Sequence, residues 1–233
     1  MILIYMNRLI LNRIHLNEVK LCVFDMAGTV VQENGIVYDT LYETIKYFKI
    51  PIKRCEINAW HGANKQEVLN YFLRREESNC VMERQDMYDH FDTQLKEKYF
   101  DGTDLSLMDE TIPTLFESLR NRDIKIALNT GYSRDIQESI LNSLDLHRMI
   151  DGYISSEDVK YGRPYPYMIY HLMEQFEVEA SKQVVKFGDT PHDIKEGHHA
   201  GCMASVGVLS GVGTNITLKS ADFIVNSVVD IDV

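Results

Sequence analysis

Short runs of β-forming residues alternate with helical patterns along most of this 233-residue chain. Each run is apolar and bounded by turn residues, which is typical of a buried strand. The runs are VKLCVF at 19–24, IKIALN at 124–129, IDGYIS at 150–155, VVKFG at 184–188, ASVGVL at 204–209 and DFIV at 222–225. Helical patterns separate most of them, at 111–121, 133–144, 164–176 and 191–200. This alternation predicts an α/β fold with a doubly wound parallel sheet.

Residues at the starts of these helical patterns support their predicted limits. Ser133 is the expected N-cap of the second helix, and Pro113 lies in the first turn of the first helix. Pro164 and Pro191 are expected to open the last two helices, because the fixed φ angle of proline suits a first helical turn.

The long stretch between the first two predicted strands carries helical patterns and no strand pattern. Three amphipathic helices are expected there, at 39–48, 64–76 and 81–100. Asp39 and Asn64 are the expected N-caps of the first two.

Linkers near 33–37 and 101–110 join this helical block to the predicted strands. A helical block that leaves and re-enters a sheet domain right after its first strand is expected to cover the carboxyl edge of the sheet. We therefore predict a core domain of residues 18–33 and 107–233, with an inserted α-helical cap domain of residues 34–106.

The chain carries 24 Lys and Arg residues against 35 Asp and Glu residues, which gives a formal net charge of -11. A field of this sign repels phosphate backbones and anionic lipid, so neither nucleic acid nor a membrane surface is an expected partner. The 4 cysteines form no CxxC pair and no zinc spacing, which favours reduced thiols in a cytoplasmic protein. Residues 1–17 predict neither a membrane span nor a signal peptide, and their role stays open.

Polar segments follow four of the predicted strands. They are DMAGTV from Asp25, NTG at 129–131, YGRPYP at 161–166 and GDTPHD at 188–193. Open α/β sheets bind ligands at the edge where the carboxyl ends of their strands meet. The segments therefore predict a site with two aspartate clusters, a hydroxyl and an arginine. The alternative is that Asp25 and Asp189 are only turn or cap residues and that Thr130 is a loop hydroxyl.

Taken together and in this order, the segments resemble the signature motifs of the haloacid dehalogenase superfamily, over residues 19–228. The resemblance implies a Rossmannoid core in which Asp25 takes up a phosphoryl group while Thr130 binds the phosphoryl oxygens. It also implies that Arg163 stands where most members have Lys.

The same resemblance implies a magnesium ion held by the Asp25 carboxylate, the Ala27 backbone carbonyl and Asp189, with Asp193 in support. Oxygen ligands of this kind suit Mg²⁺, which would neutralise charge so that a carboxylate can attack phosphorus and form an acyl phosphate. The implied substrate is a small phosphorylated or phosphonate metabolite. A homodimer is a further expectation from the resemblance.

Position 27 is where the chain departs from most phosphatases of the superfamily, which carry there a second Asp that protonates the leaving alkoxide. The methyl group of Ala27 cannot donate a proton. Losing a general acid typically costs about 10² to 10⁴ in rate. Either the leaving group needs no acid, or the chain is an inefficient ester hydrolase.

One branch that lacks this Asp is phosphonatase, the phosphonoacetaldehyde hydrolases and their phosphonatase-like relatives. The chain is similar to it in the first segment, in GRPYPYM from Gly162 and in Gly62-Ala-Asn-Lys65. In that branch a cap lysine three residues after a glycine forms a Schiff base with the substrate aldehyde, and Lys65 matches this lysine by spacing. An iminium lets the carbon leaving group depart as an enamine, which would explain why no acid is needed at position 27.

Lys65 also has a simpler interpretation, as a surface lysine in the first turn of an amphipathic helix. To act as a nucleophile it must be partly neutral, which burial under the cap or nearby positive charge from magnesium and Arg163 would favour.

Other cap residues fit phosphonatase less well. The branch has a histidine where this chain has Val68 and a methionine where it has His61. His61 could shuttle protons to the Lys65 amine if one helix carries both, or it is a polar residue before a helix cap. Gly131 and Tyr132 are expected to line the substrate pocket, although a Tyr132 packed under the cap is equally compatible with the sequence.

Three functions follow as hypotheses. The first is a magnesium-dependent hydrolase that cleaves the carbon-phosphorus bond of a 2-oxoethylphosphonate-like substrate through Asp25 and Lys65. The second is a phosphomonoesterase on the same scaffold, with protonation by His61, water or substrate. The third is a phospho-ligand-binding protein without turnover. The sequence does not specify the carbon skeleton of the substrate.

Overall fold

The computed structural model describes residues 16–32, 34–75, 81–100 and 105–231. A six-stranded sheet forms its centre, in the order β5-β4-β1-β6-β7-β8, and every neighbouring pair is parallel. The strands are β1 Leu21–Asp25, β4 Lys125–Thr130, β5 Gly152–Ser155, β6 Val184–Gly188, β7 Ala204–Val208 and β8 Phe223–Val225. The predicted α/β fold with a doubly wound parallel sheet is confirmed.

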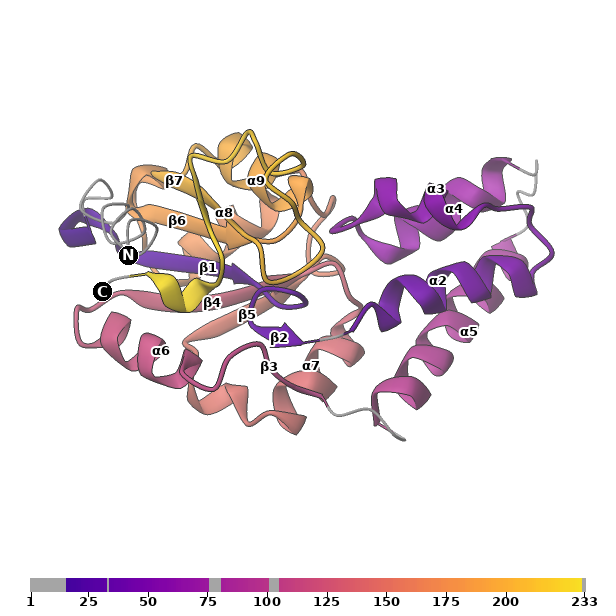
Figure 1. The fold of residues 1–233 in the computed structure, drawn as a ribbon, viewed down its shortest axis with the longest axis horizontal. Coiled ribbons are helices and arrows are strands. Elements are labelled where there is room, and N and C mark those ends of the chain that lie inside the picture. Colours follow the sequence, from indigo (N-terminus) through magenta and orange to yellow (C-terminus); the bar gives the residue numbers. More distant parts are fainter. Residues whose placement is uncertain (1–15, 33, 76–80, 101–104, 232–233) are drawn as a thin grey trace.

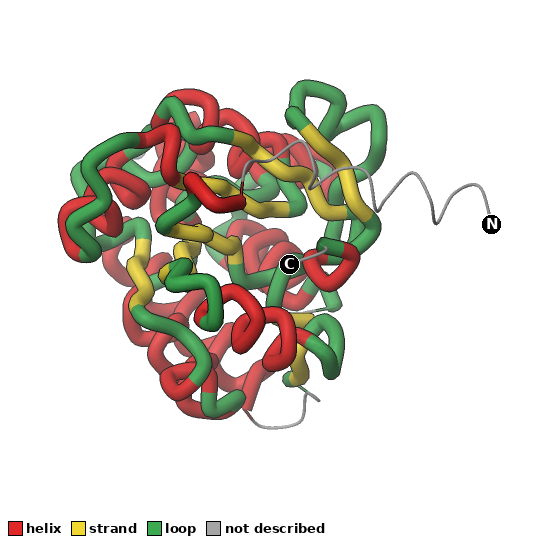
Figure 2. Tube along the Cα trace, turned by 90° about the vertical axis from the view of Figure 1, so that its left-hand side faces the viewer, coloured by secondary structure: helices red, strands yellow, loops and turns green. Residues whose placement is uncertain are grey.

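Helices cover both faces of this sheet (Figures 1 and 2). They are α6 Ile112–Arg120, α7 Arg134–Ser143, α8 Tyr167–Gln175 and α9 Pro191–Ala200. Successive residues of β1 point to opposite faces: Phe24 belongs to the apolar cluster that contains α6 and α7, and Val23 to the one that contains α8. Because β1 is apolar on both sides, it lies in the middle of the sheet. Its last residue, Asp25, therefore lies near the centre of the carboxyl edge.

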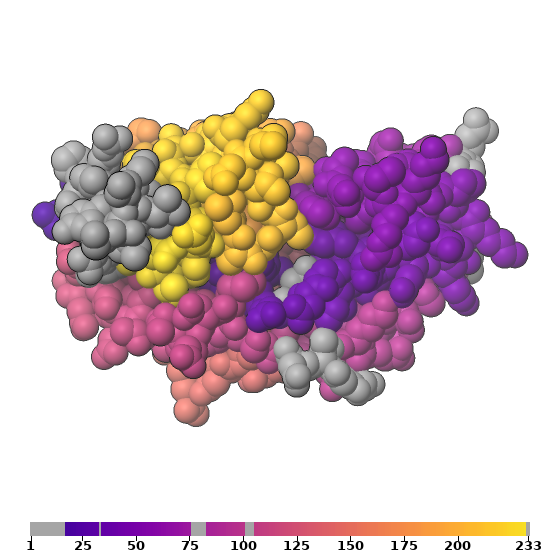
Figure 3. Space-filling view, viewed as in Figure 1, coloured from indigo at the N-terminus to yellow at the C-terminus, as the bar shows by residue number. Residues whose placement is uncertain are grey.

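Four helices lie beyond this carboxyl edge, apart from the sheet (Figure 1). They are α2 Ile36–Tyr47, α3 Arg54–Ile57, α4 Lys65–Arg75 and α5 Val81–Phe100. We call them the cap helices. In Figure 3 they pack directly against the C-terminal half of the core. Their apolar faces close on one another through buried residues such as Leu41, Phe72 and Leu95.

A two-stranded antiparallel sheet lies where the chain passes between the core and the cap helices. It consists of β2 Val31–Gln32 and β3 Ser106–Leu107, with Val31 opposite Leu107. Short 3-10 helices lie at Leu16–Glu18, Asn58–Trp60, Leu146–Arg148, Ser181–Gln183 and Val228–Asp230. The exact domain boundaries stay a prediction.

Two predicted helix starts are wrong. Helix α2 begins at Ile36 and not at Asp39, because Gly35, at φ 78, takes the left-handed N-cap position and Val37 is buried within the first turn. Helix α8 begins at Tyr167 and not at Pro164. Tyr165 precedes a second proline, Pro166, and a residue before proline is pushed out of the helical region.

The Asn64 cap of α4 is confirmed, since its side-chain oxygen accepts a hydrogen bond from the Glu67 amide at 2.9 Å. Of the cysteines, Cys22 and Cys202 are buried and Cys55 is exposed, while Cys80 lies outside the described residues. Among the described helices, none combines the length and the apolar character that crossing a bilayer requires.

Candidate active site

The turn after β1 holds Asp25 at the carboxyl edge of the sheet. Asp25 is 4% exposed. The Met26 carbonyl accepts hydrogen bonds from the amides of Val30 and Val31, both at 2.8 Å, so the chain reverses tightly. Gly28 has φ 81, and a Cβ atom there would lie 2.6 Å from Asp189 Oδ2. A glycine at position 28 is therefore needed for the close approach of this turn to Asp189.

Three buried carboxylates meet beside this turn. One carboxylate oxygen each from Asp25, Asp189 and Asp193 lies within 4.8 Å of the others. Asp189 Oδ2 accepts a hydrogen bond from the Val212 amide at 2.8 Å, while its buried Oδ1 makes no hydrogen bond with any described residue. Burial, followed by the charges of Asp25 and Asp193, raises the pKa of Asp189 well above its ordinary value.

This donor set fits a divalent cation such as Mg²⁺. Two positive charges would offset the repulsion between Asp25 and Asp189, and an oxygen ligand set is what magnesium prefers. The orphaned Oδ1 of Asp189 is a buried acceptor of the kind that needs a ligand. The proposed contribution of the Ala27 carbonyl stays a prediction.

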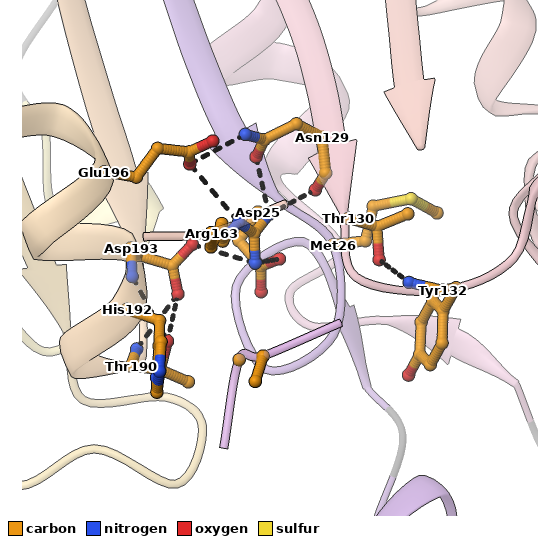
Figure 4. Close-up of polar contacts among 12 residues, drawn as sticks. Asp25, Met26, Asn129, Thr130, Tyr132, Arg163, Thr190, His192, Asp193 and Glu196 are labelled. Atoms are coloured by element: carbon orange, nitrogen blue, oxygen red, sulfur yellow. Dashed lines mark hydrogen bonds and ion pairs between the residues drawn. The ribbon is translucent and has the colours of Figure 1, made fainter. Parts of the chain in front are cut away.

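Arg163 crosses the site and joins three acidic side chains (Figure 4). Its Nη1 lies 2.6 Å from Asp25 Oδ1 and 3.0 Å from Asp193 Oδ1, and its Nε lies 3.3 Å from Glu196 Oε2. Its Nη2 donates to both oxygens of Asn129, the carbonyl at 2.7 Å and Oδ1 at 2.6 Å. The planar guanidinium thus fixes the orientation of Asp25.

Lys186 is a second buried cation, behind Arg163. Its Nζ lies 2.9 Å from Asp193 Oδ1 and donates to Asn129 Oδ1 at 2.9 Å. Burial alone would raise the pKa of Asp193, but Arg163 and Lys186 outweigh it and hold that pKa at about 2. Asp193 is therefore an anion already paired with protein cations, whereas Asp189 is not.

Two charged residues of this network, Lys186 and Glu196, lie outside the motif positions that the sequence singles out. A signal for Lys186 exists, because it is a charged residue in the middle of the otherwise apolar run VVKFG. Glu196 lies one helical turn after Asp193 on α9, so both side chains point to the same side of that helix.

The loop after β4 carries Thr130, Gly131 and Tyr132 to the contact between core and cap. Thr130 is 2% exposed, and its Oγ1 accepts a hydrogen bond from the Tyr132 amide at 3.3 Å. A Cβ atom on Gly131 would lie 2.8 Å from the Ala63 carbonyl oxygen, so the cap loop that contains Ala63 packs directly against the backbone of this glycine. The Tyr132 hydroxyl is 2.8 Å from that of Tyr99 on α5, which packs Tyr132 under the cap.

Lys65 is not a surface lysine. It is 6% exposed, its amide donates to the Gly131 carbonyl at 3.4 Å, and its Nζ donates to the Ala63 carbonyl at 2.9 Å. The Nζ atom also lies 5.2 Å from the ring centre of Tyr38 and 5.6 Å from that of Tyr132. The first residue of α4 thus brings an amine to the core loop that begins at Thr130.

His61 lies before α4 rather than on it, so it does not share a helix with Lys65. Its ring packs against that of Tyr38 at a tilt of 47°, with 4.1 Å between centroids, and its carbonyl oxygen lies 2.7 Å from Nδ1 of His192 in the core. Burial, then the charges of Lys65 and His192, lowers the pKa of His61 to about 4. The imidazole is therefore neutral at pH 7 and a weaker base than an ordinary histidine.

The cap and the core also meet at Gly62. Its φ is 79, and a Cβ atom there would lie 2.1 Å from Thr190 Oγ1. Its amide donates to the Tyr38 hydroxyl at 3.0 Å. The loop that carries His61 and Lys65 therefore lies directly against the core loop that follows Asp189.

Residues 22–207 match a protein-family model described as haloacid dehalogenase-like hydrolase. The chain belongs to this family. It is therefore a hydrolase with the buried aspartate cluster described above, and the predicted superfamily is confirmed.

The curated relatives of this haloacid dehalogenase-like hydrolase include proteins named phosphonoacetaldehyde hydrolase. One from Bacillus cereus is 38% identical over 103 residues, which cover 44% of this chain and 39% of the relative. One from Bacillus cytotoxicus is 40% identical over 94 residues, covering 40% of this chain and 35% of the relative. The matched part is thus less than half of each relative's length. The similarity confirms the predicted resemblance to the phosphonatase branch.

Solved structures of the same fold cover nearly the whole hydrolase. A phosphonoacetaldehyde hydrolase-like protein from Oleispira antarctica has a TM-score of 0.75 at 20% identity, over 92% of this chain and 90% of that one. A β-phosphoglucomutase from Clostridium difficile has a TM-score of 0.78 at 19% identity, over 92% and 93%. At these identities the similarity establishes the fold alone.

Proposed function

We propose that this protein is a magnesium-dependent hydrolase that cleaves the carbon-phosphorus bond of a 2-oxoethylphosphonate-like substrate. Asp25 is the nucleophile toward phosphorus, and Lys65 forms a Schiff base with the substrate carbonyl. The observation that carries the proposal is the burial of Lys65 where the cap meets the Thr130 loop, in a site that has Ala27 in place of an acid.

The ring faces around Lys65 support this role. An ammonium ion over Tyr38 and Tyr132 is attracted by the negative faces of both rings. An iminium ion formed at the same nitrogen keeps the positive charge in the same place, so the rings stabilise it too.

The proposed reaction passes through two covalent attachments to the protein, an iminium on Lys65 and an aspartyl phosphate on Asp25. The Lys65 amine adds to the carbonyl, and with the uptake of one proton water leaves, which gives the iminium. Asp25 then attacks phosphorus, and the electron pair of the carbon-phosphorus bond moves into the carbon skeleton to give an enamine. Water hydrolyses the aspartyl phosphate to phosphate, and protonation and hydrolysis of the enamine release the aldehyde and free Lys65.

Other residues of the site bind and orient the phosphorus group. Arg163 holds Asp25 in position through its 2.6 Å contact with Oδ1, and Thr130 contributes a hydroxyl from the neighbouring strand end. Magnesium, when held by Asp25 and Asp189 with Asp193 in support, would supply positive charge beside the phosphoryl oxygens. Gly131, Tyr132 and His61 are proposed to line the substrate side. A cytoplasmic location and a homodimer stay predictions.

Sodium borohydride reduction tests the proposal. With 2-oxoethylphosphonate present, reduction should inactivate the protein and add the substrate carbon skeleton to the peptide that contains Lys65, as measured by mass spectrometry. Lys65→Arg should lose both the adduct and phosphate release, because a guanidinium does not form the imine. Lys46→Arg is the matched control, since Lys46 lies 5.4 Å from the ring centre of Tyr42 but is exposed.

Phosphomonoester hydrolysis is the second candidate, because the cluster of Asp25, Asp189 and Asp193 suits a phosphate ester as well as a phosphonate. The alkoxide would then take its proton from water or substrate, since a neutral His61 is not a general acid at pH 7. This candidate predicts phosphate release from esters, no borohydride adduct and a measurable residual rate in Lys65→Arg. An unmodified Lys65 peptide together with ester hydrolysis would replace the first proposal with this one. The complete set of Asp25, Thr130, Arg163 and Asp189 does not favour a ligand-binding protein without turnover.

A further inference from the structure

The loop that follows β5 contacts the cap on both sides of Lys65. Asn64 Nδ2, just before Lys65, donates to Ser156 Oγ at 2.6 Å. Gln66 Nε2, just after it, donates to Glu157 Oε1 at 2.7 Å. Two consecutive core residues therefore hold the two cap residues that flank the proposed Schiff-base lysine.

The contact between Asn64 and Ser156 is the buried one of the two. Asn64 is 8% exposed and Ser156 is 4% exposed. The Asn64 side chain serves two segments, because its Oδ1 accepts the Glu67 amide as the cap of α4 while its Nδ2 donates to Ser156. The first turn of α4, which begins with Lys65, is thus tied to the core through a single side chain.

Ser156 is itself fixed by the end of β4. Its amide donates to the Thr130 carbonyl at 2.9 Å. One residue therefore joins Thr130, the proposed phosphoryl-binding residue, to the neighbour of Lys65. The Gly131 carbonyl, which accepts the Lys65 amide at 3.4 Å, adds a second link between the same two segments.

The far end of the loop approaches the other nucleophile. A Cβ atom on Gly162 would lie 3.0 Å from that of Ser156 and 3.3 Å from that of Asn64, so Gly162 packs against their contact. The next residue, Arg163, places its Nη1 2.6 Å from Asp25 Oδ1. The loop thus contacts the cap at one end and the carboxylate nucleophile at the other.

The two nucleophiles must lie at a set distance from each other, because they attack atoms of one substrate. In 2-oxoethylphosphonate the carbonyl carbon is two bonds from phosphorus. A displaced Lys65 amine therefore cannot reach this carbon while the phosphonate stays beside Asp25. A displacement of about 1 Å can cost about 10² in rate. The packing of the cap helices on one another does not define this distance, since Asp25 belongs to the core.

We propose that Ser156 is a positioning residue for Lys65, acting through Asn64, and that the loop of residues 156–163 sets the spacing between the two nucleophiles. The proposal rests on the proposed function in that it takes Lys65 as the residue that attacks the carbonyl. It goes further because it assigns the placement of the amine to a core residue, through its contact with the residue before Lys65.

Ser156→Ala tests this on the full chain, because it removes the hydroxyl and leaves the Asn64 cap of α4 in place. Reductive trapping of 2-oxoethylphosphonate on the Lys65 peptide should slow about tenfold, as expected for a displacement smaller than about 1 Å. The dissociation constant for inorganic phosphate with Mg²⁺, measured by titration calorimetry, should stay the same, because the groups that bind phosphate are unchanged. A loss of phosphate affinity equal to the loss of trapping overturns the proposal.

Methylation of Lys65 by formaldehyde and cyanoborohydride gives a readout that does not need the proposed reaction. Lys65 is 6% exposed, and the reagent reaches its amine when the first turn of α4 lifts from the core. Without the buried hydrogen bond this opening becomes about tenfold more frequent, so Lys65 should be methylated about tenfold faster in Ser156→Ala. An unchanged methylation rate overturns the proposal.

Ser205→Ala is the matched control, because Ser205 is a fully buried serine within β7 of the core. It should leave both rates unchanged. A double variant tests whether Ser156 acts through Asn64: in a chain that already carries Asn64→Ala, adding Ser156→Ala should slow trapping no further. Additive effects of the two substitutions overturn this route.

The two rates also separate this proposal from the proposed function. Faster methylation in Ser156→Ala, with no trapped adduct even in the unchanged chain, supports the placement of Lys65 by Ser156 and refutes the Schiff base. Trapping at equal rates in the unchanged chain and in Ser156→Ala refutes the positioning role alone.

Discussion

Replacing Arg163 by Lys should destabilise this protein strongly, although both side chains carry one positive charge. In the structure, three different nitrogens of the guanidinium are used: Nη1 on Asp25 and Asp193, Nε on Glu196 and Nη2 on Asn129. An ammonium group is a single nitrogen and can keep the contact with the two aspartates. It then leaves the positions of Nε and Nη2 empty.

The size of the effect follows from the two hydrogen bonds that Nη2 donates to Asn129, because the Nε contact with Glu196 is an ion pair without hydrogen-bond geometry. A hydrogen bond to a charged group is worth about 1.5 to 3 kcal/mol, so losing two buried ones should lower the free energy of unfolding by about 3 kcal/mol. For a chain of this length, each kcal/mol corresponds to about 2 to 4 °C in melting temperature, or about 6 to 12 °C in total. Glu196 and Asn129 keep each other and Lys186 as partners, which limits the loss.

Urea denaturation at pH 7 without ligand measures this difference. Arg134→Lys is the matched control, because Arg134 pairs with Asp158 at the surface and should change stability by less than about 0.5 kcal/mol. The free energy of unfolding of Arg163→Lys could instead fall by less than about 1 kcal/mol, or by no more than that of the control. Either result would refute the view that position 163 needs the separate nitrogens of a planar guanidinium.

Three further substitutions test the site and the contact between cap and core. Asp25→Asn should keep the melting temperature within a few degrees and reduce phosphate release to less than about a tenth, because an amide is a far weaker nucleophile; a higher residual rate contradicts the nucleophile role. Ala27→Asp should raise slow phosphate-ester hydrolysis by about one to two orders of magnitude without improving phosphonate cleavage, and an equal gain on both substrates would contradict the pairing of Ala27 with Lys65. Burial, with a smaller part from Glu157, raises the pKa of Asp92 on α5 to about 6. Because this folded-state pKa lies above the ordinary value, the free energy of unfolding should fall as the pH rises from about 4 to 6. In thermal melts, Asp92→Asn should therefore be more stable than the unchanged chain by about 1 kcal/mol at pH 8 and equally stable at pH 4.

The sequence predicts the sheet well because its central strands β1, β6 and β7 are buried on both faces. Such strands are continuous apolar runs, and polar residues of the site stand at the carboxyl ends of several of them, such as Asp25 at the end of β1 and Thr130 at the end of β4. The burial of Lys65 could be expected only from the resemblance. Local periodicity places it in the first turn of a helix, and it is the packing of the cap on Gly131 that removes it from solvent.

Features that depend on contacts between distant segments could not be predicted. Strands β2 and β3 have two residues each and no recognisable pattern, and they form only because they lie opposite each other. Similarly, the lowered pKa of His61 results from burial between Tyr38 and the core, and the charge network of Lys186 and Glu196 depends on how α9 packs on β6.

The pairing of β2 with β3 means that the chain leaves the core and returns to it at adjacent points, with Gln32 opposite Ser106. Two strands that are hydrogen-bonded neighbours can be joined by a short turn without moving either of them. The junction therefore sets no length for the segment between them, which carries Lys65, while the aspartates and Arg163 stay on the other side of the junction. In such a chain the chemistry at phosphorus and the choice of carbon skeleton can evolve separately.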